Sequence, residues 1–210
     1  MSNFAEYIWN YFKEKIGNEY GVAGLMGNLQ AESGLIPYRV QGDFTEGYTY
    51  SIDYTAQVDN GTISEYDFVN NGPNGKGYGL AQWTFYTRKQ NMYNMWKSGG
   101  YSSIGCIELA CDFLYHELST NYIGVLNGLK SASTIKEASD LVLHEFEKPA
   151  DQSESVENVR LNLATAHYNT FKGTGSGTGS GSGGSGGSSS SSSNRKLSKL
   201  LLFGAIINDK

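Results

Sequence analysis

Apolar residues at the start of the chain follow the spacing of an amphipathic helix. The group comprises Phe4, Ile8, Trp9, Phe12 and Ile16. This spacing places them on one helical face, and Gly17 follows as the expected stop. A second helix is predicted over residues 19–32, with its end marked by Ser33 and Gly34. It is rich in glycine and alanine, so neighbouring backbones can approach it closely.

The pattern changes between residues 37 and 83. Tyr, Thr, Ile and Val alternate there with turn signals, which are DNG at 59–61, NGP at 71–73 and NG at 74–75. Alternation of this kind favours strands, and the turn signals separate short ones. We therefore expect a small, irregular β region.

Helical spacing resumes after residue 84. We predict helices over residues 85–97, 104–118, 134–146 and 153–171. Thr84 and Ser103 are the expected N-caps of the first two, and Thr134 with Glu137 has the pattern of a capping box. The predicted fold class is mainly α (α+β), a helical domain with a small β insertion after the second helix.

The C-terminal part of the chain has a different composition. Residues 173–193 are almost entirely Gly and Ser, with no side chain that can bury area against a core. We expect residues 1–172 to form one domain, 173–193 to be a disordered, flexible linker, and 194–210 to be a short, partly apolar segment. Its apolar run, 200–207, is far shorter than the roughly 20 residues that a membrane-spanning helix needs. An interfacial helix, a docking peptide or the stub of a further module all fit it.

The charge of the chain limits its partners. A net charge of -5 argues against nucleic acid, because phosphate binding needs a basic face. The same charge repels anionic wall polymers. The N-terminus lacks a basic stretch followed by a continuous apolar run, so we expect no secretory signal peptide.

The cysteines and histidines do not indicate a metal site or a thiol enzyme. Cys106, Cys111 and His116 are spaced by five residues within one predicted helix, which turns each about 140° from the last. They share no face, so a Cys-His hydrolase, a disulfide and a zinc site are all disfavoured. No phosphate loop or dinucleotide fingerprint is present. The sequence predicts no cofactor and no metal.

A glutamate stands among small and apolar residues in GNLQAESG, residues 27–34. Glu32 lies there at the predicted end of the second helix. A desolvated carboxyl has a raised pKa and can act as a general acid, as glycoside hydrolysis requires. A surface residue at a helix terminus is the alternative, although the helix dipole disfavours an anion there.

A second stretch, GKGYGLAQWTFYTRKQ at 75–90, carries candidate binding groups. Gln82 offers an amide donor and an acceptor, while Tyr78 and Trp83 offer apolar faces for sugar rings. Glycines around Tyr78 allow a substrate to approach the backbone. A structural turn with packed aromatic residues fits the same stretch.

Four motifs in this order resemble the phage tail tip lysozyme family, within the lysozyme-like superfamily of goose-type lysozymes and lytic transglycosylases. They are NLQAESG at 28–34, VDNG at 58–61, GYGLAQWT at 77–84 and FEKPAD at 146–151. The resemblance covers about residues 4–171 and implies a lysozyme-like domain with Glu32 as the catalytic acid. It favours Asp59 as a second acid. The alternative is that the Asp59 side chain does no more than cap its turn. It places Glu147 near the cleft or in support of the last loop, with a salt bridge to Arg160 or Arg88 as the simpler role.

The expected function is cleavage of the peptidoglycan glycan strand, of muramidase type, with Gln82 and Trp83 positioning sugar. The resemblance further implies a component of the phage virion at the tail tip that opens the bacterial wall, joined to tail proteins through the C-terminal segment. A lytic transglycosylase or an N-acetylglucosaminidase would use the same Glu32. A non-catalytic wall-binding module of the tail would keep the groove without needing the acid.

Overall fold

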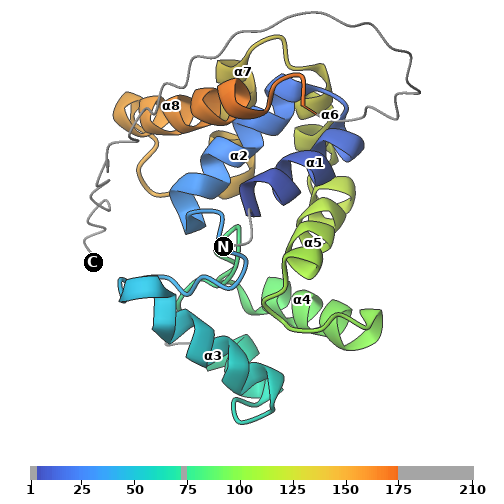
Figure 1. Cartoon of the computed structure of the whole chain (residues 1–210), viewed down its shortest axis with the longest axis vertical. Coiled ribbons are helices and arrows are strands. Elements are labelled where there is room, and N and C mark those ends of the chain that lie inside the picture. Colours follow the sequence, from blue (N-terminus) through green and yellow to red (C-terminus); the bar gives the residue numbers. More distant parts are fainter. Residues whose placement is uncertain (1–3, 72–74, 175–210) are drawn as a thin grey trace, which may run out of the picture. The chain divides into compact units, whose positions relative to one another are not determined.

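The computed structural model describes residues 4–71 and 75–174, and this part of the chain is helical (Figure 1). Its helical segments are α1 (Phe4–Ile16), α2 (Glu19–Ser33), η1 (Glu46–Tyr48), α3 (Thr49–Asp59), η2 (Asp67–Asn71), α4 (Tyr86–Gly99), α5 (Ile107–Thr120), α6 (Ile123–Ser131), α7 (Ile135–Val142), η3 (Leu143–Glu147) and α8 (Glu154–Phe171). The mainly helical prediction is confirmed. Most of the predicted linker and all of the C-terminal segment lie outside the described residues.

Helix α2 is the centre of the packing, in contact with α1, α6, α7 and α8. Its glycines explain how several helices approach it. A Cβ on Gly21, Gly24 or Gly27 would lie 2.1, 2.5 and 2.5 Å from atoms of α6, α7 and α8 respectively. Because real Cβ contacts are longer than this, glycine at these positions permits the observed helix spacing. The predicted close approach of backbones to this helix is confirmed.

Several predicted helix boundaries agree with the structure. Gly17 has a φ of 74°, and Gly34 has a φ of 68° and donates its N–H to the carbonyl of Gln30. These left-handed glycines end α1 and α2. The capping box is also present, since the hydroxyl of Thr134 accepts from the N–H of Glu137 at 3.1 Å.

Two predicted N-caps are wrong. Helix α4 begins at Tyr86 after Phe85, and α5 begins at Ile107 after Cys106. Thr84 instead donates its hydroxyl to the carbonyl of Gln82, and Ser103 accepts from the N–H of Gly105. Cys106 therefore precedes α5 and does not share it with Cys111, and both thiols are free.

The predicted β insertion is wrong in the described residues, which hold only isolated bridges between Val40 and Tyr78 and between Tyr78 and Trp83. Helix α3 occupies the middle of the insertion. Its buried residues are Ser51, Tyr54, Thr55 and Val58. Their spacing is that of a helix face, and it is hidden in the sequence because two of the four are polar.

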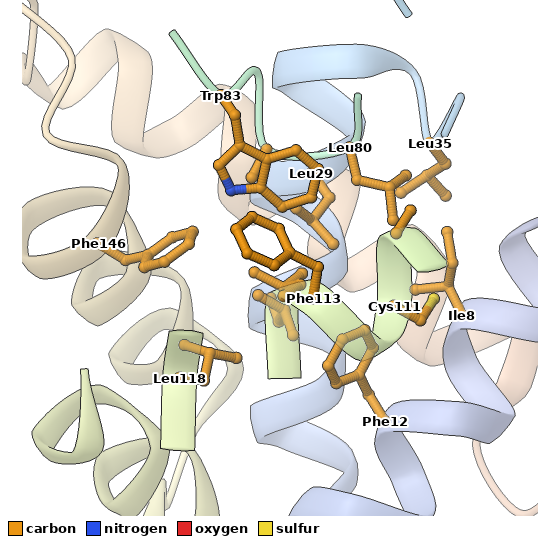
Figure 2. Close-up of a cluster of buried hydrophobic side chains, with 14 of the residues drawn as sticks. Ile8, Phe12, Leu29, Leu35, Leu80, Trp83, Cys111, Phe113, Leu118 and Phe146 are labelled. Carbon is orange, nitrogen blue, oxygen red and sulfur yellow. The ribbon is translucent and has the colours of Figure 1, made fainter. Parts of the chain in front are cut away.

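The helices share one hydrophobic core, and the segment that precedes α4 also contributes side chains to it (Figure 2). Trp83 lies against Phe113 of α5, with ring centroids 5.1 Å apart and planes at 64°. Edge-to-face contacts of this kind add to the gain from burial. Within the described residues, no helix is both long and apolar enough to cross a bilayer.

Candidate active site

The carboxyl group of Glu32 lies in the last turn of α2 and accepts a hydrogen bond from Nη2 of Arg160 in α8. The Glu32 side chain is 23% exposed, whereas that of Arg160 is 9% exposed. Burial raises the pKa of Glu32, and the charge and hydrogen bond of Arg160 oppose this rise. The site therefore holds a largely desolvated carboxyl that still reaches the surface.

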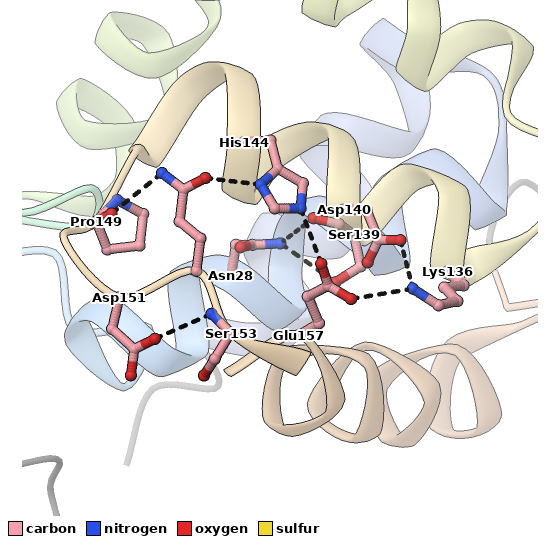
Figure 3. Close-up of polar contacts among 10 residues, drawn as sticks. Asn28, Lys136, Ser139, Asp140, His144, Pro149, Asp151, Ser153 and Glu157 are labelled. Atoms are coloured by element: carbon pink, nitrogen blue, oxygen red, sulfur yellow. Dashed lines mark hydrogen bonds and ion pairs between the residues drawn. The ribbon is translucent and has the colours of Figure 1, made fainter. Parts of the chain in front are cut away.

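Local structure and helix packing together place this pair. Gly34 ends α2 two residues after Glu32, and the absence of a Cβ on Gly27 lets the Arg160 backbone lie against α2. The buried side chain of Asn28 donates to the carbonyl of Ser139 at 3.0 Å, which ties α2 to α7 (Figure 3). The acid is thus carried by a helix fixed on two sides.

Glu147 lies at the end of η3, the π-helical turn that continues α7. Its Oε1 is buried and has no hydrogen-bond partner in the described part of the chain. Burial raises the pKa of Glu147 well above its usual range, and the charge of Glu32 raises it further. The guanidinium groups of Arg88 and Arg160 act in the opposite direction, and Glu117 adds a smaller rise. Glu147 is therefore within electrostatic reach of Glu32.

The salt bridge expected between Glu147 and Arg88 or Arg160 is not among the ion pairs of the described residues. Arg160 pairs with Glu32, and Arg88 pairs with Glu117. Sequence reasoning named both arginines but gave them the wrong partner.

Glu117 was missed as part of this network. It is 3% exposed and accepts two hydrogen bonds from Arg88, at 2.6 and 2.7 Å. A third comes from Nε1 of Trp83 at 2.7 Å. Its position between Leu114 and Leu118 of the apolar stripe was the available signal, because a carboxylate beside such a stripe requires a buried partner.

Tyr78 and Trp83 are both 0% exposed. The Tyr78 hydroxyl is hydrogen-bonded to that of Thr55 at 2.8 Å, and the Trp83 indole is bonded to Glu117. A ring without an exposed face cannot stack on a sugar, so the predicted contact does not fit this structure. Both residues belong to the hydrophobic core.

The side chain of Gln82 is held by backbone carbonyls from two segments. Its Nε2 donates to the carbonyls of Gly79 at 2.8 Å and Arg39 at 3.2 Å, and its Oε1 is buried with no partner among the described residues. These bonds fix the side chain between residues 39 and 79. The two hydrogen bonds hold the amide in place, and its oxygen accepts no hydrogen bond among the described residues.

Asp59 is the last residue of α3, and its Oδ1 accepts from the N–H of Ile104 at 2.8 Å. This bond anchors the segment that leads into α5. In Figure 1 the C-terminal end of α3 points away from α2. The structure does not bring Asp59 to Glu32. The turn signal itself is correct, because Asn60 accepts from the N–H of Thr62.

Non-glycine residues with positive φ gather in the segments that surround these groups. Among the described residues they are Leu35, Tyr48, Gln82 and Lys148, with φ between 47° and 61°. Leu35 follows the end of α2, and Lys148 directly follows Glu147. Such backbone conformations cost on the order of 1–3 kcal/mol each and persist where the surrounding structure fixes them.

A surface network supports the loop after Glu147 (Figure 3). His144 is hydrogen-bonded to Gln152 at 2.8 Å and to Glu157 of α8 at 3.0 Å, and Lys136 contacts Glu157 at 3.4 Å. These contacts join η3, residues 149–153 and α8. No cluster of His, Cys, Asp and Glu suited to a metal ion occurs among the described residues.

Residues 3–171 match the family model for phage tail lysozymes. The chain belongs to the phage tail lysozyme family. A search of curated proteins gave no match. The matched span contains Glu32, Gln82, Glu147 and Arg160, and every helix described here. Membership of the phage tail lysozymes implies lysozyme-type activity on peptidoglycan and association with a phage tail.

Proposed function

We propose that this protein hydrolyses the glycan strand of peptidoglycan, at the β-1,4 bond from muramic acid to glucosamine, with Glu32 as the general acid. The observation that carries the proposal is the Glu32 carboxyl, which is desolvated, partly exposed and held at the end of α2 by Arg160. Family membership supports the substrate class and a role in the virion at the phage tail.

The chemistry follows from this arrangement. Protonated Glu32 donates to the glycosidic oxygen, the bond to the sugar carbon breaks, and water adds to the oxocarbenium-like centre. Asp59 is engaged with the backbone of Ile104, so it is not proposed as the second acid. The charge of Glu32 raises the pKa of Glu147, a second buried carboxyl. Gln82, which is half-buried whereas Tyr78 and Trp83 are fully buried, is the proposed contact for a sugar.

The test is product analysis with the intact chain and with Glu32→Gln. Purified peptidoglycan is digested, the fragments are reduced, and the reducing-end sugar is identified by mass spectrometry. We expect muramitol ends from the intact chain and a loss of about 10²- to 10⁴-fold in the variant, the usual contribution of general acid catalysis. Glu14→Gln, at a side chain that is 78% exposed, is the matched control and should retain activity.

Other products would change the assignment. Anhydro ends would indicate a lytic transglycosylase, and glucosaminitol ends a glucosaminidase, each with the same acid. If the intact chain released no fragments but still bound glycan, the enzyme proposal would be overturned in favour of a wall-binding module.

A further inference from the structure

Arg39 differs from the other arginines that the structure describes. Arg88 and Arg160 each pair with a glutamate. Arg39 forms no ion pair with a described residue, and its buried Nη1 donates no hydrogen bond to one. The side chain is half-buried, so it is partly desolvated and still reaches the surface. Buried charged and polar groups are normally paired, so an anion from outside the described chain would satisfy this cation.

Tyr48 supports the guanidinium group of Arg39. The Cζ atom of Arg39 lies 4.1 Å from the centroid of the Tyr48 ring. Stacking of this kind occupies the flat face of a guanidinium group and leaves its edge for a planar acceptor with two oxygens, such as a carboxylate. The Tyr48 hydroxyl lies 4.0 Å from the position that a Cβ on Gly34 would take. Because Gly34 follows Glu32 by two residues, Tyr48 lies against the end of α2 that carries the proposed acid.

The segments that carry these side chains are fixed by hydrogen bonds. Nε2 of Gln82 donates to the Arg39 carbonyl at 3.2 Å. The N–H of Tyr48 donates to the Thr45 carbonyl at 3.0 Å, and Thr45 in turn donates to the buried carboxylate of Asp43. Tyr48 and Gln82 also have positive φ, at 58° and 47°. Strained backbone of this kind is concentrated at functional sites, so it supports a binding role for this cluster.

We propose that Arg39, stacked on Tyr48 at the end of α2, binds a carboxylate of the peptidoglycan strand next to the bond that Glu32 cleaves. This inference rests on the proposed function, and it adds a charged contact to the sugar contact assigned to Gln82.

Peptidoglycan offers this carboxylate in two places. Where the stem peptide has been removed, the lactyl group of muramic acid ends in a carboxylate. Where the peptide is present, its own residues carry carboxylates. Because the chain has a net charge of -5, an arginine without an internal anion provides a local attraction that the molecule as a whole lacks.

The test is a set of binding measurements by calorimetry on the full chain carrying Glu32→Gln, which is expected to bind glycan without cleaving it. The ligands are glycan strands stripped of stem peptides, strands that keep them, and a neutral chitin oligosaccharide. With Arg39→Gln added, the affinity for carboxylate-bearing strands should fall roughly 10- to 100-fold, the usual contribution of hydrogen bonds to a charged group. The affinity for the chitin oligosaccharide should not change.

Two further variants control for charge. Lys97→Gln removes an exposed cation that also lies over an aromatic ring, that of Trp96, at 3.7 Å from its centroid. It should leave all three affinities unchanged. Arg39→Lys keeps the charge but loses the planar edge with two donors, so it should recover only part of the affinity.

The pattern across the three ligands decides the outcome. A loss confined to stripped strands would identify the lactyl carboxylate, and a loss confined to peptide-bearing strands would identify a carboxylate of the stem. A loss in both would show that Arg39 accepts either. An equal loss for all three ligands would show a merely structural role, and unchanged affinities would show no role; either result would overturn the proposal.

NMR provides a readout that leaves Arg39 in place. In the Glu32→Gln chain, stripped strands or peptide-bearing strands should shift the ¹⁵N signal of the Arg39 Nε–H group, whereas the chitin oligosaccharide should not. If neither kind of carboxylate-bearing strand shifted this signal, the proposal would be overturned without any change at Arg39.

The inference and the proposed function fail separately. In the chain that retains Glu32, Arg39→Gln should raise KM for carboxylate-bearing strands and leave kcat nearly unchanged. If the unmodified chain cleaves glycan and KM does not respond to Arg39→Gln, only this inference is overturned. If the chain binds strands through Arg39 but cleaves none, the proposed function is overturned and the carboxylate site remains.

Discussion

Two glutamates at the ends of helical segments have very different surroundings in this protein. Glu32 is bonded to an arginine and partly exposed, whereas Glu147 has a buried, unpartnered oxygen. The difference comes from Arg160 of α8, whose guanidinium group bonds Glu32 but not Glu147. At the residue scale, the role of each carboxyl therefore depends on which side chain from a distant part of the sequence contacts it. The same holds for Trp83 and Asp43.

Trp83→Phe should destabilise the fold rather than weaken sugar binding. It removes the indole donor to Glu117, and a hydrogen bond to a charged group contributes about 1.5–3 kcal/mol. The matched control is Trp9→Phe, because Trp9 is equally buried and its Nε1 has no partner among the described atoms. Urea unfolding should show the larger loss for Trp83→Phe, with KM nearly unchanged. A large rise in KM at unchanged stability would restore the sugar-stacking role.

Asp43 should make stability depend on pH. Burial opposes its ionisation, but hydrogen bonds from Ser51 and Thr45 lower its pKa to about 2 from 3.8. Its contribution, about 2 kcal/mol, is present above pH 4 and is lost as pH falls toward 2. Asp43→Asn should therefore lower the free energy of unfolding near neutral pH and progressively less in acid. Asp53→Asn, at an exposed position of α3, should change it little; a constant difference for Asp43→Asn at all pH would contradict this account.

At the scale of the elements, α2 owes its central place to glycine. Gly21, Gly24 and Gly27 face α6, α7 and α8 at distances that a side chain would not allow. The same contact that packs α8 on α2 brings Arg160 to Glu32. Packing of the helices and electrostatics of the site are therefore linked.

Gly27→Ala should lower stability and activity together. The added Cβ would meet the Arg160 carbonyl at 2.5 Å and the Ala164 Cβ at 2.6 Å, and overpacking of this kind costs about 1–3 kcal/mol. Displacement of α8 should also weaken the bond between Arg160 and Glu32. In the control Gly124→Ala, nothing lies within 4 Å of the new Cβ in α6. That change should stabilise the helix by about 0.5–1 kcal/mol, and thermal unfolding of both variants checks the pair. An equal change in thermal stability for Gly27→Ala and Gly124→Ala would contradict the packing argument.

At the scale of the whole molecule, most helices and their ends were predictable. Gly17, Gly34 and the Thr134 box act on neighbouring backbone groups, so the signal is local. Helix α3 was not predictable by alternation, because its buried face contains Ser51 and Thr55, which read as polar. The structure satisfies them with Asp43 and Tyr78, which lie outside the helix.

The sequence by itself determined a mainly helical domain, the position of Glu32 at the end of α2, and the motifs of the phage tail lysozyme family. These depend on residues close together in the chain. Only the tertiary structure decided that Tyr78 and Trp83 are buried, that Arg160 bonds Glu32, and that Glu147 has a buried oxygen without a partner among the described residues. Burial and charge pairing depend on which segments, far apart in the sequence, come into contact. The local pattern of residue types does not contain that information.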